Sequence, residues 1–280
     1  MIKVGSNLGQ FQILRKIGSG GMGTIFAAMD TVLHRKVALK VIHEHLVGNP
    51  KSVDAFRKEA VTQAQLIHPN IVSIYAFHQL NNHHAMVMEY VEGESLRDIL
   101  RMRKYLGAGE AVGNMKQLLR GLRYAHGFNI VHQDIKPGNL IRTPGGQLKI
   151  SDFGIAAIAG IYPRADDGFI MATPWYASPE QLCGRPADQR SDLFSAGVTL
   201  YEMLTGEIPF DAGVWDPEHP RKWVDRIKDW MPPSSKREGI DNALDEFVSK
   251  SIQKEPERRF QNAGEMLTAL DGIRINNLPA

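Results

Sequence analysis

The pattern of apolar and polar residues predicts a series of short strands in the first third of the chain. Lys36–Ile42 alternates with period two, as expected for a strand with two different faces. Phe11–Ile17 and Thr24–Ala28 are earlier apolar segments of strand length, and Ile71–Phe77 and Ala85–Val91 are later ones. Together these segments indicate a small β-rich unit that ends near residue 90.

One helix is predicted inside this unit, because the apolar period changes after Ser52. Apolar residues recur at helical spacing from residue 53 to residue 67, and Ser52 is placed to cap the first turn. His68 precedes Pro69, and the residue before a proline is pushed out of the helical region. The helix is therefore expected to end there.

Helical patterns dominate after Glu92. They cover residues 95–104, 110–128, 190–205, 220–230, 241–253 and 262–273. The exception is a β-hairpin predicted for Asn139–Ile141 and Gln147–Ile150, with Gly145 and Gly146 in its turn.

The change from strands to helices predicts an α+β protein of two lobes. We expect one domain over residues 1–280, made of a small antiparallel β lobe with one main helix and a larger, mostly helical lobe. The first lobe is expected at 1–90, the hinge at 89–94 and the second lobe at 95–280.

Composition narrows the class of protein. Lys and Arg number 33 against 31 Asp and Glu, a net charge of +2, and the basic residues do not cluster, so no nucleic-acid partner is expected. The single cysteine, Cys183, excludes a disulfide scaffold and is expected to be an inert thiol. No run of about 18 apolar residues is present, which predicts a cytoplasmic protein or the cytoplasmic part of a longer, membrane-anchored one.

A glycine motif lies between the first two predicted strands. Gly18, Gly20 and Gly23 have the spacing G-x-G-x-x-G, which in dinucleotide-binding proteins runs from a strand into a helix. Here a strand follows instead, so the glycines belong to a hairpin whose backbone N–H groups can contact phosphates. A purely structural hairpin stays open as the alternative.

Lys40 and Glu59 are candidates for an ion pair. Alternation places Lys40 on the same face of its strand as Ala38, which suits a flat ring over the alanine and phosphates near the ammonium. Glu59 lies at the edge of the apolar stripe of the helix predicted over residues 53–67. The alternatives are a lysine that reaches to solvent and a solvated carboxylate.

The predicted hairpin brings two oxygen-bearing side chains together. If Leu140 pairs with Ile150, then Asn139 lies opposite Asp152, within about 5 Å across the strands. An amide oxygen and a carboxylate suit Mg²⁺, and Asp134 lies a few residues upstream. Turn capping is the structural alternative for Asp134 and Asn139.

In combination, these motifs resemble the eukaryotic-like protein kinase superfamily, and most closely the bacterial Ser/Thr protein kinases. The resemblance covers roughly residues 8 to 272 and rests on several motifs in a fixed order. These are Gly18–Gly23, Ala38–Lys40, Glu59, His132–Asn139, Asp152–Gly154, Ser178–Glu180, Ser191–Gly197 and Arg259.

The resemblance implies a role for each catalytic residue. Asp134 would accept or orient the proton of the attacking hydroxyl, and Lys136 would contact the γ-phosphate. Lys40, held by Glu59, would contact the α- and β-phosphates. Asp192 would brace the backbone of the catalytic loop, and Arg259 would pair with Glu180.

The resemblance also implies ATP and Mg²⁺, or Mn²⁺ in its place, as cofactors. Asn139 and Asp152 would hold the metal. Nucleotide binding is expected at Ile17, Gly18, Gly20, Gly23, Ile25, Ala38, Lys40, Met88, Glu89, Val91, Asn139, Ile141 and Asp152.

The implied activity is transfer of the γ-phosphate of ATP to a protein substrate. Lys136 and the segment from Thr173 to Ser178 resemble the Ser/Thr branch, which predicts serine and threonine hydroxyls as acceptors. A pseudokinase that binds nucleotide and acts as a scaffold or regulator is the alternative.

Two residues depart from the family pattern. Gln133 stands where many members have the arginine that receives an activating phosphate, and residues 155–172 contain no Ser or Thr. We therefore expect activity that does not depend on Ser/Thr phosphorylation in that segment. Gln63 replaces an apolar residue, which indicates either a half-exposed side chain or a helix 53–67 controlled by a regulatory partner.

The remaining aromatic and histidine clusters have simpler interpretations. Trp215, Trp223 and Trp230 are expected in core packing, with a docking surface as the alternative. The histidines lack the spacing of a metal site and are expected to be solvated loop residues. They are His43, His45, His83 and His84.

Overall fold

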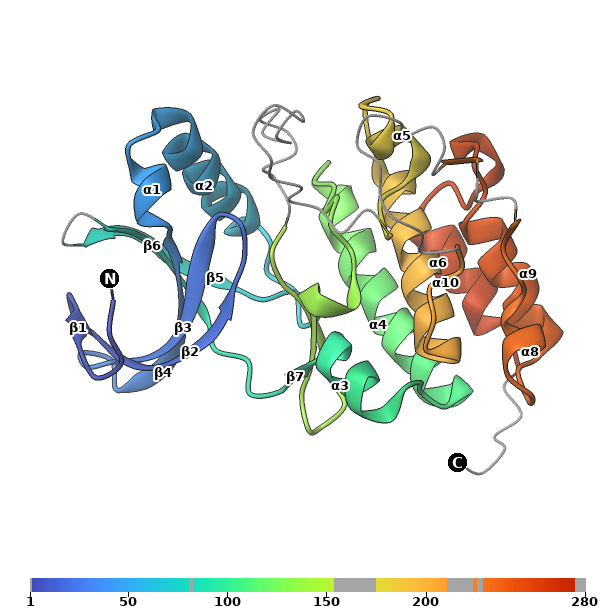
Figure 1. Cartoon of the computed structure of the whole chain (residues 1–280), viewed down its shortest axis with the longest axis horizontal. Coiled ribbons are helices and arrows are strands. Elements are labelled where there is room, and N and C mark those ends of the chain that lie inside the picture. The colour runs from blue at the N-terminus through green and yellow to red at the C-terminus, as the bar shows by residue number, and fades with distance from the viewer. Residues whose placement is uncertain (1, 81–82, 154–174, 211–223, 226–228, 275–280) are drawn as a thin grey trace. The chain divides into compact units, whose positions relative to one another are not determined.

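The alternating segments near the N-terminus pair into one antiparallel sheet in the computed structural model, which describes residues 2–80, 83–153, 175–210, 224–225 and 229–274 (Figure 1). The strand order is β1-β2-β3-β4-β6-β5. The bounds are Asn7–Leu8 for β1, Phe11–Ser19 for β2, Gly23–Asp30 for β3, Arg35–Ile42 for β4, Ile74–Leu80 for β5 and His83–Glu89 for β6.

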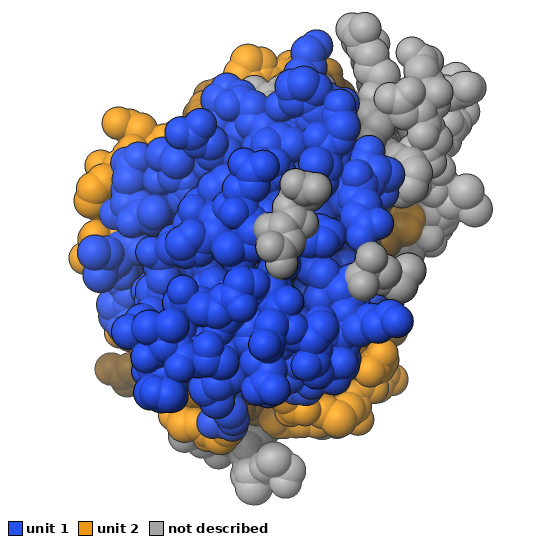
Figure 2. All heavy atoms as spheres, turned by 90° about the vertical axis from the view of Figure 1, so that its left-hand side faces the viewer, with its two compact units in different colours: residues 1–92, 154–162 blue, residues 93–153, 163–280 orange. Residues whose placement is uncertain are grey.

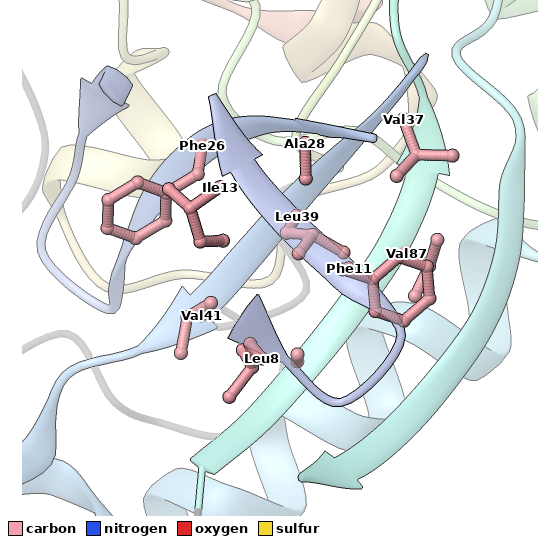
Figure 3. Close-up of a cluster of buried hydrophobic side chains, with 10 residues drawn as sticks. Leu8, Phe11, Ile13, Phe26, Ala28, Val37, Leu39, Val41 and Val87 are labelled. Atoms are coloured by element: carbon pink, nitrogen blue, oxygen red, sulfur yellow. The ribbon is translucent and has the colours of Figure 1, made fainter. Parts of the chain in front are cut away.

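The two faces of β4 enter two different apolar clusters, as its alternation predicts. Val37, Leu39 and Val41 are buried on one face, together with side chains from β1, β2, β3 and β6 (Figure 3). Ala38 lies on the other face and clusters with Val72 and Met88. Each large apolar side chain buried in this way contributes about 1.5–3 kcal/mol to the stability of the sheet.

The helix predicted inside this unit begins and ends earlier than expected. A short helix, α1 (Glu44–Val47), precedes α2 (Pro50–Gln63). Asn49, not Ser52, caps α2, because its side chain accepts the Lys51 N–H at 3.0 Å and Pro50 fits the first helical position. The predicted end was also wrong.

The chain leaves α2 after Gln63, several residues before Pro69. Leu66 donates its N–H to the carbonyl of Gln63 in a turn and is 1% exposed, whereas the next residue, Ile67, is 79% exposed. The apolar residues at the end of the predicted stripe therefore do not share a helical face, which is why helical spacing overestimated the helix.

The described residues after Glu92 form a second compact unit, coloured orange in Figure 2. This unit is mainly helical. Its helices are α3 (Leu96–Arg103), α4 (Ala108–Gly127), α5 (Pro179–Leu182), α6 (Gln189–Thr205), α8 (Pro233–Lys236), α9 (Asn242–Ser251) and α10 (Ala263–Asp271), with the 3₁₀ turns η1 (Pro137–Asn139) and η5 (Pro256–Arg258). Five of the six predicted helices are confirmed. The sixth, 220–230, lies mostly outside the described residues.

The core of this second unit forms around α6. Helices α4, α9 and α10 pack against α6, and α10 also packs against α4. A Cβ at Gly197 in α6 would lie 2.5 Å from the Cβ of Ser251 in α9, so only glycine allows this close approach. In the described parts of the chain, no helix combines the length and apolar composition that a membrane-spanning segment requires.

A three-stranded sheet in the second unit carries the predicted hairpin. Its order is β7 (Glu94–Ser95), β8 (Leu140–Arg142) and β9 (Leu148–Ile150). Leu140 pairs with Ile150, as predicted, and Gly146 has the positive φ of +81° that the turn requires. This register places Asn139 and Asp152 just beyond the paired ends of the two strands.

Candidate active site

The glycine motif forms the predicted hairpin between β2 and β3. Gly20 donates its N–H to the carbonyl of Gly23 at 2.9 Å, and nothing lies within 4 Å of a Cβ built on Gly18 or Gly20. A Cβ on Gly23 would lie 2.4 Å from the carbonyl oxygen of Val41, so glycine is required where the hairpin meets β4. At these glycines the hairpin therefore leaves its backbone uncovered by side chains of its own.

His43 contacts this hairpin, which the sequence interpretation missed. Its Nε2 lies 2.8 Å from the carbonyl oxygen of Gly20, and its backbone N–H donates to the carbonyl of Met22. His43 is half-buried in the loop after β4 and its ring also stacks on that of His45, so this loop histidine has defined neighbours. The only signal in the sequence for this contact was the position of His43, directly after β4.

Lys40 and Glu59 form the expected ion pair. The ammonium of Lys40 on β4 lies 2.6 Å from a carboxylate oxygen of Glu59 on α2, and the two side chains are 12% and 4% exposed. Phe56, one turn before Glu59, is fully buried and its ring contacts that of Phe77 on β5. This apolar contact turns the Glu59 face of α2 toward the sheet.

Gln63 also holds α2, and it is not the half-exposed side chain that the sequence allowed. Its side chain is buried, and its amide donates a hydrogen bond to the carbonyl of Val72 at 2.9 Å. A buried hydrogen bond therefore ties the end of α2 to the segment before β5, and α2 is firmly docked at this point.

Some of the residues expected to surround the adenine ring lie side by side. Ala38 pairs with Met88 across β4 and β6, and Ile25 and Val91 pack against the same cluster. Glu89 follows Met88 and exchanges hydrogen bonds with Ser73 through both its backbone N–H and its carboxylate.

Two further expected contacts are not part of this cluster. Ile17, on β2, is 43% exposed. Ile141 lies on β8 in the second unit, opposite Lys149.

In the second unit, a buried neutral histidine shapes the catalytic loop. Burial lowers the pKa of His132 despite the nearby carboxylates of Asp192 and Asp134. Its Nε2 lies 3.0 Å from the carbonyl oxygen of Ser151, and its Nδ1 accepts the Asp134 N–H at 3.2 Å. A single neutral tautomer, with the proton on Nε2, satisfies both bonds.

Asp134 is held by two donors. The ammonium of Lys136 lies 2.9 and 2.7 Å from its two carboxylate oxygens, and the amide of Asn139 donates to one of them at 2.9 Å. The Asn139 amide also donates to the backbone carbonyl of Asp134 at 2.8 Å. The Asp134 side chain nevertheless stays 35% exposed, so its carboxylate is open to solvent.

Asn139 and Asp152 supply the oxygen ligands expected for a metal. The backbone carbonyl of Asn139 accepts the Ser151 N–H at 2.9 Å, which places Asp152 one residue beyond it. Asp152 has a φ of +55°, a left-handed conformation that a non-glycine residue adopts only when its surroundings hold it. The Asn139 amide nitrogen faces Asp134 and contacts both its backbone carbonyl and its carboxylate.

This donor set fits Mg²⁺. Magnesium is commonly bound by one or two protein oxygens and completes its octahedral shell with waters and phosphates. No group of three or more His, Cys, Asp and Glu side chains with metal-binding geometry occurs among the described residues.

Asp192 braces the catalytic loop from α6. Its carboxylate accepts the backbone N–H groups of His132 and Gln133 at 2.8 and 2.7 Å, and it also contacts the ring of His126 at 2.8 Å. Asp192 is fully buried, and these hydrogen bonds offset the cost of removing its carboxylate from water. The loop that carries Asp134 is thus fixed to the most buried helix of the unit.

A second buried ion pair anchors α5. The guanidinium of Arg259 donates to both carboxylate oxygens of Glu180, at 2.7 and 2.8 Å, and Ser191 donates to the same carboxylate. Burial alone would raise the pKa of Glu180, but Arg259 and Ser191 outweigh it and lower the pKa to about 2. Glu180 is therefore ionised over the whole neutral range.

The weaker expectations have mixed outcomes. Trp230 is half-buried with its ring edge-on to Tyr201, and Cys183 is a free, half-buried thiol after α5. Trp215, Trp223 and Thr173 lie outside the described residues, as does the segment 155–172.

Comparison with known families identifies this set of residues. The family model described as "Protein kinase domain" matches residues 11–269, which include both the Lys40–Glu59 pair and the catalytic loop. The chain belongs to the protein kinase family.

Three curated relatives from bacteria illustrate this membership. The chain is 34% identical over 275 residues to the serine/threonine-protein kinase PrkC of Bacillus subtilis, covering 96% of this chain and 42% of PrkC. It is 35% identical to PknA of Mycobacterium tuberculosis, covering 99% of this chain and 64% of PknA, and 37% identical to PknB of Mycobacterium leprae, covering 93% and 42%. It thus spans less than two thirds of these relatives.

Solved structures show the same fold. The kinase domain of Mycobacterium tuberculosis PknI superposes with a TM-score of 0.74 at 22% identity, covering 97% of this chain and 99% of that one. The predicted α+β fold, with a small antiparallel β part containing one main helix and a larger, mostly helical part, is therefore confirmed.

Proposed function

We propose that this chain is an ATP-dependent protein kinase that transfers the γ-phosphate of Mg-ATP to serine and threonine hydroxyls of proteins. The observation that carries the proposal is the Asp134 carboxylate, held by Lys136 and Asn139 yet open to solvent. The names of the curated relatives support serine and threonine as acceptors. We further propose that residues 1–280 act as one kinase domain.

In this proposal the first unit binds the nucleotide. The apolar cluster around Ala38 and Met88 suits an adenine ring, and the Gly18–Gly23 hairpin offers backbone N–H groups to the phosphates. Lys40 contacts the α- and β-phosphates, with its ammonium positioned by Glu59.

The second unit supplies the groups that act on the transferred phosphoryl group. A divalent cation, for which Mg²⁺ is our proposal, would be held by Asn139 and Asp152 and would neutralise phosphate charge. Asp134 orients the acceptor hydroxyl and receives its proton as the hydroxyl oxygen bonds to the γ-phosphorus and the bond to ADP breaks. Lys136 stabilises charge on the γ-phosphoryl oxygens.

Transfer from labelled ATP to a generic basic protein tests the proposal. We expect label in the acceptor when Mg²⁺ is present and none when it is chelated. Nucleotide binding without transfer, under Mg²⁺ or Mn²⁺, would instead support the pseudokinase alternative.

Glu59→Gln should weaken the enzyme without unfolding it. The amide still accepts a hydrogen bond from Lys40 but carries no charge, so we expect kcat/KM for ATP to fall about tenfold. The matched control is Asp54→Asn on the same helix, whose surface pair with Lys58 is 58% exposed at the carboxylate. That control should stay within about twofold of wild type. Equal effects of the two variants would contradict the role of Glu59.

Activity should not require phosphorylation of the 155–172 segment. Gln133 carries no charge to receive a phosphate, and the segment has no Ser or Thr. We expect phosphatase-treated protein, shown by mass spectrometry to be unmodified between residues 155 and 172, to transfer phosphate as fast as untreated protein. A modified residue in that segment that raises the rate would overturn this prediction.

A regulatory partner on the helix predicted over residues 53–67 receives no support. That idea rested on a loosely docked helix, whereas Gln63 is buried and bonded to Val72.

A further inference from the structure

The backbone just before Asp134 is in an unfavourable conformation. Gln133 has a φ of +65°, in the left-handed region that is unfavourable for a non-glycine residue. Such a conformation persists only where neighbouring groups hold it. Because the next residue is Asp134, whatever holds Gln133 also sets the position of the Asp134 carboxylate.

Two side chains hold the Gln133 backbone from two directions. Asp192 accepts the Gln133 N–H at 2.7 Å, as the brace already described. On the other side, the amide of Gln181 donates to the Gln133 carbonyl at 2.8 Å. The Gln133 peptide groups are thus clamped between α6 and α5.

Gln181 is itself fixed by the helix that carries it. Its amide oxygen accepts both the backbone N–H and the hydroxyl of Ser178, each at 3.0 Å, in a capping box at the start of α5. Ser178 is fully buried, and Glu180 beside it is bound to Arg259. The donor that reaches Gln133 therefore stands on a rigid support.

We propose that Gln181 is a positioning residue, a neutral clamp that joins α5 to the catalytic loop and holds Asp134 ready without a phosphate. This inference rests on the proposed kinase function. Both partners in the Gln181–Gln133 contact are uncharged, because an amide N–H meets a backbone carbonyl. The contact forms with no covalent modification. This agrees with the neutral side chain of Gln133, which has no charge to bind a phosphate.

Gln181→Glu separates the clamp from the helix cap. The new carboxylate still accepts from Ser178 but has no N–H for the Gln133 carbonyl, which is then left facing a negative charge. We expect kcat to fall by about ten- to a hundredfold, from the loss of a hydrogen bond and an unsatisfied acceptor. The KM for ATP should stay within about twofold, since Gln181 is not among the residues expected to bind nucleotide.

Gln189→Glu is the matched control. Gln189 also donates its amide to a backbone carbonyl, that of Gln261 at 2.8 Å, but in an exposed position. Its kcat should equal that of wild type. If Gln181→Glu lowers the melting temperature so far that the protein unfolds in the assay, Gln181→Met, which adds no charge, decides by the same criterion.

Hydrogen exchange of the full chain provides a readout that does not need activity. We expect the backbone amides of residues 133–135 to exchange at least about fivefold faster in the Gln181 variants than in wild type, because the clamp that orders them is gone. A kcat within twofold of wild type, or unchanged exchange in a folded variant, would overturn the inference. A wild-type protein that transfers no phosphate would refute the proposed function instead, and exchange alone would then decide on the clamp.

Discussion

Asp134→Asn should reduce kcat by about 10²–10⁴-fold, the usual contribution of a positioned general base. Asparagine has nearly the same shape and can keep a contact with Lys136, but it cannot take the hydroxyl proton. Nucleotide affinity should change little, because Asp134 lies on the catalytic loop and the residues proposed to bind the adenine and Lys40 lie on other elements. Steady-state kinetics with a Ser/Thr-containing protein, together with ATP binding by calorimetry, measure the two effects separately.

The matched control for this variant is Asp241→Asn. Asp241 caps α9 through an exposed hydrogen bond to the Ala243 N–H at 2.8 Å, so the same chemical change occurs far from the catalytic loop in sequence. We expect its kcat to equal that of wild type. An Asp134→Asn enzyme that keeps a tenth or more of wild-type kcat would show that Asp134 is not the base.

Arg259→Met should produce the largest loss of stability, about 3–5 kcal/mol in the free energy of unfolding, because it leaves a buried carboxylate without its partner. Glu180 is 5% exposed and Arg259 is 2% exposed. Besides its two bonds to Glu180, Arg259 donates to the backbone carbonyls of Gln253, Lys254 and Arg190. Methionine fills a similar volume but satisfies none of these acceptors.

Denaturant unfolding of Arg259→Met beside Arg258→Met tests this prediction. Arg258 is exposed and precedes Arg259, so its loss should change the free energy of unfolding by no more than about 0.5 kcal/mol. Equal stability of the two variants would contradict the account of this ion pair.

The pair should also appear in the pH dependence of stability. The pKa of Glu180 falls from its ordinary 4.5 to about 2 in the folded protein, so its stabilisation is complete above pH 4.5 and is lost as the pH falls through about 2. Without Arg259, burial should raise this pKa instead, and the wild-type advantage should shrink in that acidic window. A constant difference between the two proteins down to pH 2 would argue against this linkage.

Sequence patterns predicted the structure best where a single local pattern determines a strand face or a strand register. Alternation in Lys36–Ile42 was enough to separate the two faces of β4, and the turn glycines fixed the Leu140–Ile150 register. Positions that come from motif order also agree with the geometry: Lys40 meets Glu59 on α2. The fold brings the two residues of such a pair together, so the order of the motifs is enough to predict the contact.

Other features depended on tertiary contacts that no local pattern contains. The end of α2 and the burial of Gln63 follow from how the segment before β5 packs, since the Gln63 partner is a backbone carbonyl with no signature in sequence. The same holds for His43 and Gln181, whose partners are the carbonyls of Gly20 and Gln133. Side chains that bind distant backbone groups are the part that sequence reasoning missed.

Phosphoamino-acid analysis after transfer from γ-labelled ATP tests the central claim most directly. The full chain is incubated with Mg²⁺ and a basic acceptor protein, and the acceptor is hydrolysed to identify the labelled residues. The account predicts label on serine and threonine for wild type and almost none for Asp134→Asn. Label on tyrosine alone, or a wild-type protein that binds ATP and transfers nothing, would contradict it.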